Sequence, residues 1–168
     1  MNTFSILEDV LKKISAMKIR IHGDYHLGQV LFTGNDFVII DFEGEPARSI
    51  SERRLKRSAL RDIAGMVRSF HYAAYTALMT NKTLSPENIQ SLKIWADLWY
   101  QVTTGVFINT YLNIVNEAPF MPKEKDELKM MLDAYILEKA IYEVAYELNN
   151  RPEWVSMPIH AITQLIAD

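Results

Sequence analysis

The sequence contains no cysteine, and this absence removes several classes of chemistry. Without thiols the chain forms no disulfide, no zinc–thiolate centre and no cysteine nucleophile, and its residue usage gives no support for secretion. Lys and Arg number 18 against 21 Asp and Glu, so the formal net charge is −3. Affinity for nucleic acid or for anionic lipid requires a basic excess, and neither partner is therefore expected.

Long hydrophobic runs are also missing, as are internal repeats and a basic, apolar leader at the N-terminus. A membrane-spanning helix needs about 20 mostly apolar residues, so no membrane segment is expected. Apolar residues make up 49% of the 168 positions and charged residues 23%, which is ordinary for a globular domain. These features predict a single cytoplasmic domain with its own core.

Most of the chain has the pattern of amphipathic helices, with apolar residues three and four positions apart. Ser85 and Pro86 suit the cap and first turn of one of them, and Asn149 or Asn150 could close another in the left-handed conformation. Trp95 and its neighbour four residues on, Trp99, are expected in the core. The predicted helices span 3–17, 58–80, 86–116, 123–149 and 154–166.

Two short runs rich in β-branched and aromatic residues, 29–33 and 37–42, flank the turn-forming sequence Gly34-Asn35-Asp36. Together they predict a β-hairpin, preceded by an extended piece over 18–22. The stretch 44–57 is predicted to be a loop with a solvated basic run. The fold class is therefore mostly α with a β-hairpin (α+β).

Three polar residues are expected near one end of this hairpin. Asp24 lies in the loop before the first strand, Gln29 begins that strand, and Asp41 ends the second. Because the two arms have similar lengths, Gln29 and Asp41 should return to the same end. Mg²⁺ prefers such hard oxygen ligands and leaves places for phosphate and water, which suits phosphoryl transfer. In this interpretation Asp24 orients an acceptor hydroxyl and takes its proton.

The segment His22-Gly23-Asp24-Tyr25-His26-Leu27-Gly28-Gln29 resembles the catalytic loop of the aminoglycoside phosphotransferase and choline-kinase-like group, His-Gly-Asp-x-His-x-x-Asn. Together with Asp41-Phe42-Glu43-Gly44-Glu45-Pro46, it looks specifically like bacterial maltokinases, including those fused to trehalose synthase. The likeness continues through 60–70 and resumes over 138–154. It implies the C-terminal lobe of a protein-kinase-like fold, and ATP-dependent phosphorylation of maltose to maltose 1-phosphate.

The resemblance also implies a role for each matching residue. Asp24 would be the catalytic base, held in place by His22 and His26, while Gln29 and Asp41 would bind Mg²⁺. Most relatives have Asn where this chain has Gln29, but the maltokinase-like group shares the Gln, whose carbonyl oxygen lies one methylene further out.

Residues outside the loop are also candidates for roles in the site. Asp62, early in a helix, would brace the catalytic loop as structural support. One face of the last long helix mixes charges with apolar residues, which is unusual for a core face. A disaccharide cleft would explain the mixture, with Trp154 as a wall; an ion pair between Lys139 and Glu143 on a half-exposed seam would explain it equally well. The expected sugar contacts are Lys139, Tyr142, Glu143, Tyr146 and Arg151.

Kinases of this group also have an N-terminal lobe in which a glycine-bearing strand pair covers the phosphates of ATP. The chain has six glycines and no Gly-x-Gly motif, so that ATP-binding lobe is expected to be absent. Residues 1–168 would form one lobe, with the catalytic loop and metal-binding hairpin at 18–48 and a helical substrate subdomain at 58–168. ATP and Mg²⁺ are the expected cofactors, maltose or a related sugar the substrate, and the missing lobe or a fused trehalose synthase region the partner.

Other interpretations stay open at this stage. The lobe could be a non-catalytic interaction module of a trehalose synthase assembly, or it could serve a kinase of another sugar or an aminoglycoside. A metallohydrolase is less favoured, because the four histidines of the chain are too few and too scattered for a typical site. The isolated chain is expected to have little kinase activity without an ATP-binding lobe.

Overall fold

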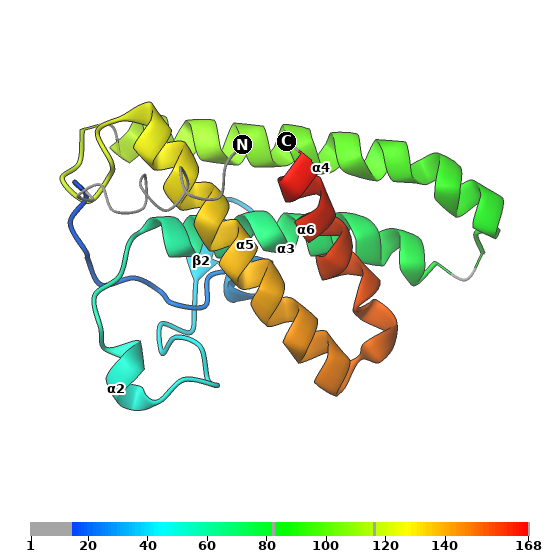
Figure 1. Ribbon diagram of the computed structural model, residues 1–168, viewed down its shortest axis with the longest axis horizontal. Helices are drawn as coiled ribbons and strands as arrows, with labels where there is room; N and C mark the ends of the chain where they lie inside the picture. Colours follow the sequence, from blue (N-terminus) through cyan, green and yellow to red (C-terminus); the bar gives the residue numbers. More distant parts are fainter. Residues whose placement is uncertain (1–14, 82, 116, 168) are drawn as a thin grey trace.

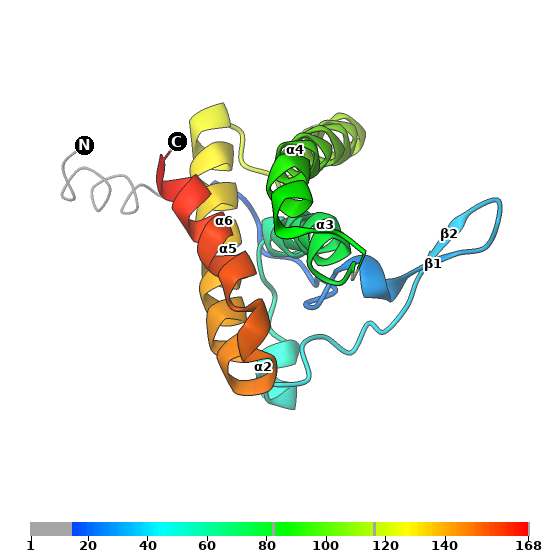
Figure 2. The same cartoon turned by 90° about the vertical axis from the view of Figure 1, so that its right-hand side faces the viewer.

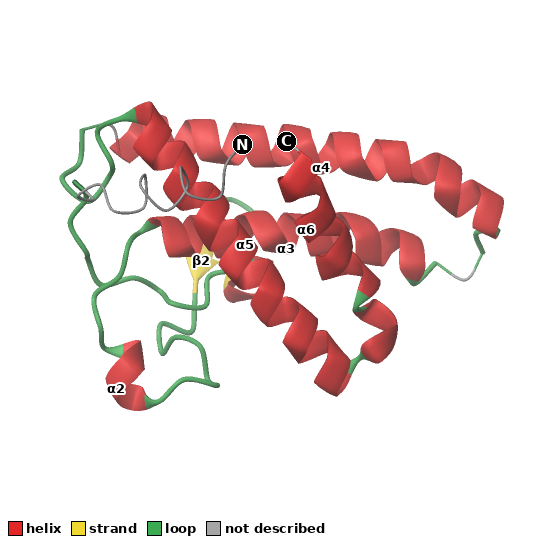
Figure 3. Ribbon diagram, in the orientation of Figure 1, coloured by secondary structure: helices red, strands yellow, loops and turns green. Residues whose placement is uncertain are grey.

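The computed structural model describes residues 15–81, 83–115 and 117–167, which form an arrangement of packed helices with one projecting hairpin (Figures 1 and 3). The hairpin strands are β1 (Val30–Phe32) and β2 (Phe37–Ile39), preceded by a 3₁₀ turn, η1 (Leu27–Gln29). The helices are α2 (Ile50–Arg53), α3 (Leu60–Met79), α4 (Pro86–Val115), α5 (Lys125–Asn150) and α6 (Ser156–Ala167), with a second 3₁₀ turn, η2 (Pro152–Trp154), before the last.

Helix α3 is the centre of the fold. It packs against α4 on one side and α5 on the other, and α6 covers α5 (Figure 2). Apolar residues at steps of three and four place Ile63, Ala64 and Val67 in one buried cluster with Ile136 of α5. A second cluster joins Leu60 to the methionines Met121 and Met131. The core therefore lies along α3. The first turns of α3 support the loops that carry the candidate site.

The predicted hairpin is confirmed, with strands of three residues. Val30 pairs with Ile39, and Phe32 with Phe37, in an antiparallel ladder. Gly34 closes the turn with a φ of 96°, which favours glycine. The hairpin projects away from the helices (Figure 2) and most of its side chains are exposed. Gln29 itself ends η1 rather than beginning β1.

The four helices predicted from residue 58 onward are present, but three local predictions need correction. Residues 3–14 of the first predicted helix lie outside the described residues, and 15–17 are not helical. The stretch 44–57 contains α2, stabilised by a reciprocal capping box between Ser49 and Glu52. Asn149 and Asn150 are helical rather than left-handed, and the residue that ends α5 is Arg151, with a φ of −147° and a ψ of 69°.

The prediction that Trp95 and Trp99 belong to the core is wrong. Their exposed fractions are 65% and 46%. Helix α4 has apolar residues on both its inner and its outer side, and it turns Tyr100, Phe107 and Tyr111 toward α3 instead. None of the helices, over the described residues, is long and apolar enough to cross a membrane.

Candidate active site

The loop that contains Asp24 is suspended from the first turn of α3 by Asp62. The backbone N–H groups of His22 and Gly23 donate to the two carboxylate oxygens of Asp62, at 2.7 and 2.9 Å. Burial raises the pKa of Asp62, although these two donors act in the opposite direction. One turn further along, a Cβ at Gly65 would lie 2.6 Å from the carbonyl oxygen of Tyr25. A glycine there lets the loop lie directly on the helix.

Both histidines of the loop help to fix its shape. His22 is 7% exposed, and its Nε2 lies 2.7 Å from the carbonyl oxygen of Ile40, just after β2. His26 caps η1, because its Nδ1 accepts the N–H of Gly28 at 3.0 Å. The loop is thereby attached to the hairpin as well as to α3.

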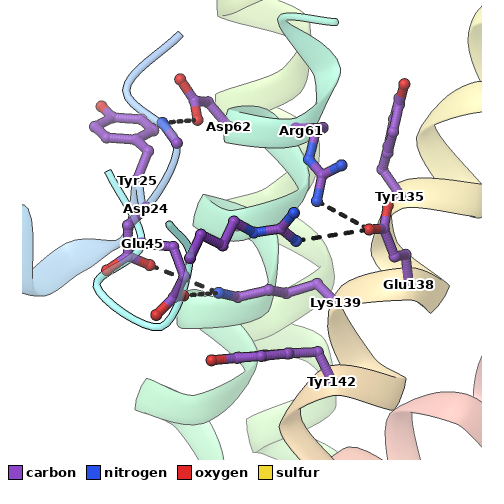
Figure 4. Close-up of a pocket in the computed structure, with 12 residues that line it drawn as sticks. Asp24, Tyr25, Glu45, Arg61, Asp62, Tyr135, Glu138, Lys139 and Tyr142 are labelled. Carbon is purple, nitrogen blue, oxygen red and sulfur yellow. Dashed lines mark hydrogen bonds and ion pairs between the residues drawn. The ribbon is translucent and has the colours of Figure 1, made fainter. Parts of the chain in front are cut away.

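Asp24 faces a pocket between this loop, the segment after the hairpin, α3 and α5 (Figure 4). The Nζ of Lys139 lies 3.6 Å from Asp24 and 3.6 Å from Glu45, and the Nε2 of His26 lies 3.7 Å from Asp24. Burial alone would raise the pKa of Asp24, but the contact with His26 and the charge of Lys139 bring it below its usual value. Asp24 is therefore an ionised carboxylate at neutral pH, able to accept a proton.

The opposite wall of the pocket is a second group of charges. Arg61 donates to Glu138 at 2.9 Å, and Arg48 lies 4.0 Å from the same carboxylate oxygen. The ring of Tyr135 lies beneath the guanidinium of Arg61, and the ring of Tyr142 lies 5.2 Å from the Nζ of Lys139. Flat aromatic faces and paired charges thus border one cavity (Figure 4).

Gln29 and Asp41 meet at the base of the hairpin, as their spacing predicts. The Nε2 of Gln29 donates to the Oδ2 of Asp41 at 3.0 Å. No group of three His, Cys, Asp or Glu side chains in the described residues could hold a metal alone. An amide oxygen and an exposed carboxylate nevertheless fit Mg²⁺, which commonly takes one or two protein oxygens and completes its shell with phosphate and water.

The structure brings only two of the five expected sugar contacts, Lys139 and Tyr142, into the pocket. Glu143 is instead buried against Arg68 of α3, so the seam pair between Lys139 and Glu143 does not form. The reason is that helical periodicity places these residues on one face without showing which element each one meets.

The other two expected sugar contacts lie at the far end of α5. Arg151 donates two hydrogen bonds to Glu147, at 2.9 and 2.7 Å. Its guanidinium lies 4.2 Å from the centre of the Trp154 ring and 5.7 Å from that of Tyr146. This cluster is separate from the residues that line the Asp24 pocket.

Sequence reasoning missed the other charged residues of the pocket: Glu45, Arg48, Arg61 and Glu138. Glu45 had a signal, because it lies in the stretch that follows Asp41 and resembles maltokinases. Arg61 and Glu138 had the same kind of signal, since they lie in the resembling stretches 60–70 and 138–154, whereas Arg48, in a predicted loop, had none. Only the folding of the segment after the hairpin onto α5 shows their position.

No protein-family model matches the chain. A protein named glucosamine kinase from Streptacidiphilus jiangxiensis is 21% identical over 168 residues, which cover 96% of this chain and 36% of that protein. A second glucosamine kinase, from Mycolicibacterium smegmatis, is 26% identical over 145 residues, 86% of this chain and 34% of that protein. The chain thus spans about a third of the length of these relatives.

Solved structures show the same fold. A glucosamine kinase in complex with glucosamine, ADP and inorganic phosphate matches with a TM-score of 0.71 at 22% identity, over 89% of this chain and 35% of that one. Another crystal form of glucosamine kinase gives a TM-score of 0.72, over 89% and 34% of the two chains. The helical fold with its hairpin is therefore shared with part of these glucosamine kinases, and the relatives are named for glucosamine rather than for maltose.

Proposed function

We propose that this chain is the catalytic-loop lobe of an ATP-dependent sugar kinase, in which Asp24 is the base. The observation that carries the proposal is the ionised carboxylate of Asp24, which faces a pocket of tyrosines and paired charges. The nearness of Gln29 to Asp41 supports it, since each side chain carries an oxygen that a magnesium site could use, although the contact between them is made by the amide nitrogen of Gln29. The relatives named glucosamine kinase add independent support.

The proposed reaction asks little covalent chemistry of the protein. The acceptor hydroxyl lies against Asp24, its oxygen bonds to the γ-phosphorus of ATP, and the bond from phosphorus to the ADP oxygen breaks. The hydroxyl proton passes to the carboxylate of Asp24, while His26 and Lys139 hold that carboxylate in place. Gln29 and Asp41 would hold Mg²⁺, which supplies neutralisation of the phosphate charge.

Glucosamine is the acceptor that we favour. Tyr135 and Tyr142 offer flat faces to a sugar ring, and Glu45 and Glu138 offer carboxylates to hydroxyl or ammonium groups. Maltose is the second candidate, because the Asp-Phe-Glu-Gly-Glu-Pro stretch that begins at Asp41 resembles maltokinases. We also propose that the contacts to the adenine and ribose of ATP come from a further lobe, whether it belongs to the same polypeptide or to a trehalose synthase partner.

The test is ADP release with glucosamine, maltose and an aminoglycoside as acceptors. It is run on the 168-residue chain and on the longest polypeptide that contains it. Asp24→Asn should lower kcat by about 10²-fold or more, the usual contribution of a positioned base. Asp36→Asn, in the exposed hairpin turn, is the matched control and should leave kcat unchanged. Equal activity of Asp24→Asn and the parent, or no acceptor-dependent ADP release from either polypeptide, would contradict the proposal.

A further inference from the structure

The basic run after the hairpin lies beside a second basic segment. Residues 18–20 and 53–57 together hold six of the chain's 18 Lys and Arg residues. The N–H of Ile19 donates to the carbonyl oxygen of Arg57 at 2.9 Å, and the N–H of Arg57 donates to that of Ile19 at 2.8 Å, so the backbone holds the two segments side by side (Figure 1). Like charges in close proximity repel, which makes this cluster costly unless an anion accompanies it.

No ion pair engages these six cations in the described part of the chain, since none of them lies within 4.0 Å of a carboxylate oxygen. Glu52, the carboxylate of α2, instead accepts from the N–H and the hydroxyl of Ser49, at 3.0 and 2.7 Å. The two arginines that line the Asp24 pocket are, by contrast, both paired with Glu138. The charge of the cluster is therefore available to an anion that the described chain does not supply.

Three of the six cations, Arg20, Arg53 and Arg54, line a hollow of about 310 Å³ beside α2, which we call the Arg20 hollow. Its lining contains one carboxylate against these three guanidinium groups, so the hollow is positively charged. The remaining lining residues are Ile21, Phe42, Glu43 and Ile50. Phe42 and Ile50 are 59% and 64% exposed, so an apolar wall adjoins the charges.

Arg53 is anchored at this hollow, whereas the sequence alone predicts a solvated basic run. Its Cγ and Cδ both lie 3.6 Å from the position of a Cβ at Gly44, and its Nη1 donates to the carbonyl oxygen of Glu43 at 3.3 Å. Its Nε is shielded from solvent and has no hydrogen-bond partner in the described residues. The side chain is thus held in place with donors left over, so an anion would bind it with little further loss of side-chain entropy.

We propose that the Arg20 hollow binds a phosphate group, either as inorganic phosphate or as the phosphate of a small monoester. A guanidinium offers paired N–H donors that match two phosphate oxygens, and it keeps its charge at any physiological pH. Arginines from two separate segments of the chain line this one hollow and can donate to a single phosphate together. Phe42 and Ile50 offer a surface to an organic group attached to that phosphate.

The Arg20 hollow is separate from the proposed kinase centre. None of the residues that line it also lines the pocket that Asp24 faces. A phosphate bound there would link Arg20, which precedes the Asp24 loop, to α2, which follows the hairpin. The inference is therefore independent of the proposed kinase function, and its test needs no turnover.

The test is isothermal titration of the 168-residue chain with inorganic phosphate and with phenyl phosphate, in magnesium-free buffer. Arg20→Gln and Arg54→Gln each remove one exposed guanidinium and should raise Kd about tenfold, since charge-assisted hydrogen bonds to phosphate are lost. Glu43→Gln removes the one carboxylate of the hollow and should lower Kd about threefold, because a repulsive charge is removed. Lys125→Gln, at the exposed start of α5, is the matched control and should change Kd by less than about twofold.

The two probes distinguish the sources of the phosphate. Tighter binding of phenyl phosphate would assign the hollow to a monoester, equal or tighter binding of inorganic phosphate would assign it to phosphate itself, and either result supports the site. No saturable binding of either probe at millimolar concentration, or the same Kd in Arg20→Gln, Arg54→Gln and Lys125→Gln, would overturn the proposal. Binding that Arg61→Gln weakens and Arg20→Gln does not would place the phosphate in the Asp24 pocket and would also overturn it. If Arg20→Gln does not give a native circular dichroism spectrum, Arg54→Gln reports on the same hollow.

Discussion

Arg68 of α3 donates two hydrogen bonds, from Nε and Nη2, to a single carboxylate oxygen of Glu143 on α5, at 2.9 and 2.7 Å. The two residues are 1% and 9% exposed, so the pair is inside the protein. Next to it, the hydroxyl of Tyr72 donates to Glu147 of the following helical turn. The packing of α3 against α5, and with it the geometry of the Asp24 pocket, is held partly by charge.

Glu143→Leu should therefore destabilise the fold strongly. It leaves the Arg68 guanidinium buried without a partner, which typically costs about 3–5 kcal/mol in the free energy of unfolding. Urea unfolding measures this, with Glu138→Leu as a control, because the more exposed pair with Arg61 should be worth about 1 kcal/mol or less. The double replacement Arg68→Met with Glu143→Leu should recover most of the loss. A single Glu143→Leu variant as stable as the control would contradict this account.

His71 should make the fold sensitive to acid. It is fully buried, and neither ring nitrogen has a hydrogen-bond partner in the described residues. Burial, aided by the charges of Arg68 and His160, lowers the pKa of His71 to about 3. An unfolded histidine titrates near pH 6.5. Between these values unfolding takes up a proton, so the stability gained from a neutral His71 is complete above about 6.5 and declines toward pH 3.

Unfolding free energies measured over this window should fall by up to about 1.4 kcal/mol per pH unit from this group. His71→Phe keeps a ring of similar size beside Tyr75 and should flatten the slope by that amount. An identical slope in His71→Phe would show that another group controls the acid response.

Lys139→Met should raise the pKa of Asp24, because the nearby cation favours the ionised carboxylate. The pKa of the side-chain carboxyl can be followed by carbon-13 NMR in the 168-residue chain, without any need for activity. Lys139→Arg should retain much of the effect, and Lys125→Met, at the exposed start of α5, should have none. In an active kinase, the acidic limb of the pH–rate profile should move to higher pH with Lys139→Met. An Asp24 that titrates identically in Lys139→Met and the parent would show that Lys139 does not set its charge.

Gly65→Ala should disturb the loop that contains Asp24. The added methyl would lie 2.6 Å from the carbonyl oxygen of Tyr25, and an overpacked contact of this kind typically costs about 1–3 kcal/mol. Gly105→Ala on α4 is the matched control, since nothing lies within 4 Å of its added Cβ. That change should stabilise the helix by up to about 1 kcal/mol. Thermal unfolding of both variants gives the comparison, and similar stability changes would refute the close approach at Gly65.

The sequence predicted the hairpin and the meeting of residues at its base, because these features depend on short spacings. The two hairpin runs and their turn are contiguous, so the meeting of Gln29 with Asp41 follows from strand geometry alone. Predicting the two hydrogen bonds from Asp62 to the loop that contains Asp24 required the family resemblance, since the bonded residues are 39 and 40 positions apart. It could not have been derived from periodicity.

The long-range contacts were beyond a pattern-based prediction. Glu143 shares a helical face with Lys139, yet one meets Arg68 in the core and the other meets Asp24 in the pocket. Which side of α5 each residue contacts depends on how α3 crosses it. The prediction that Trp95 and Trp99 are buried was wrong for a related reason. A helix with apolar residues on both sides has no periodic signal that distinguishes its inner face from its outer face.

Asp41 is the one non-glycine residue with positive φ, at 61°, in the described part of the chain. Asp, Asn and Gly tolerate this left-handed backbone, whereas most other residues are strained there. The backbone turn and the proposed binding of Mg²⁺ by the carboxylate thus place two separate constraints on the residue type at this position. A lineage that lost the chemistry while it kept the fold would be expected to drift to Asn or Gly at this position. Of Asp, Asn and Gly, only Asp would also supply the negative charge that the proposed magnesium site uses.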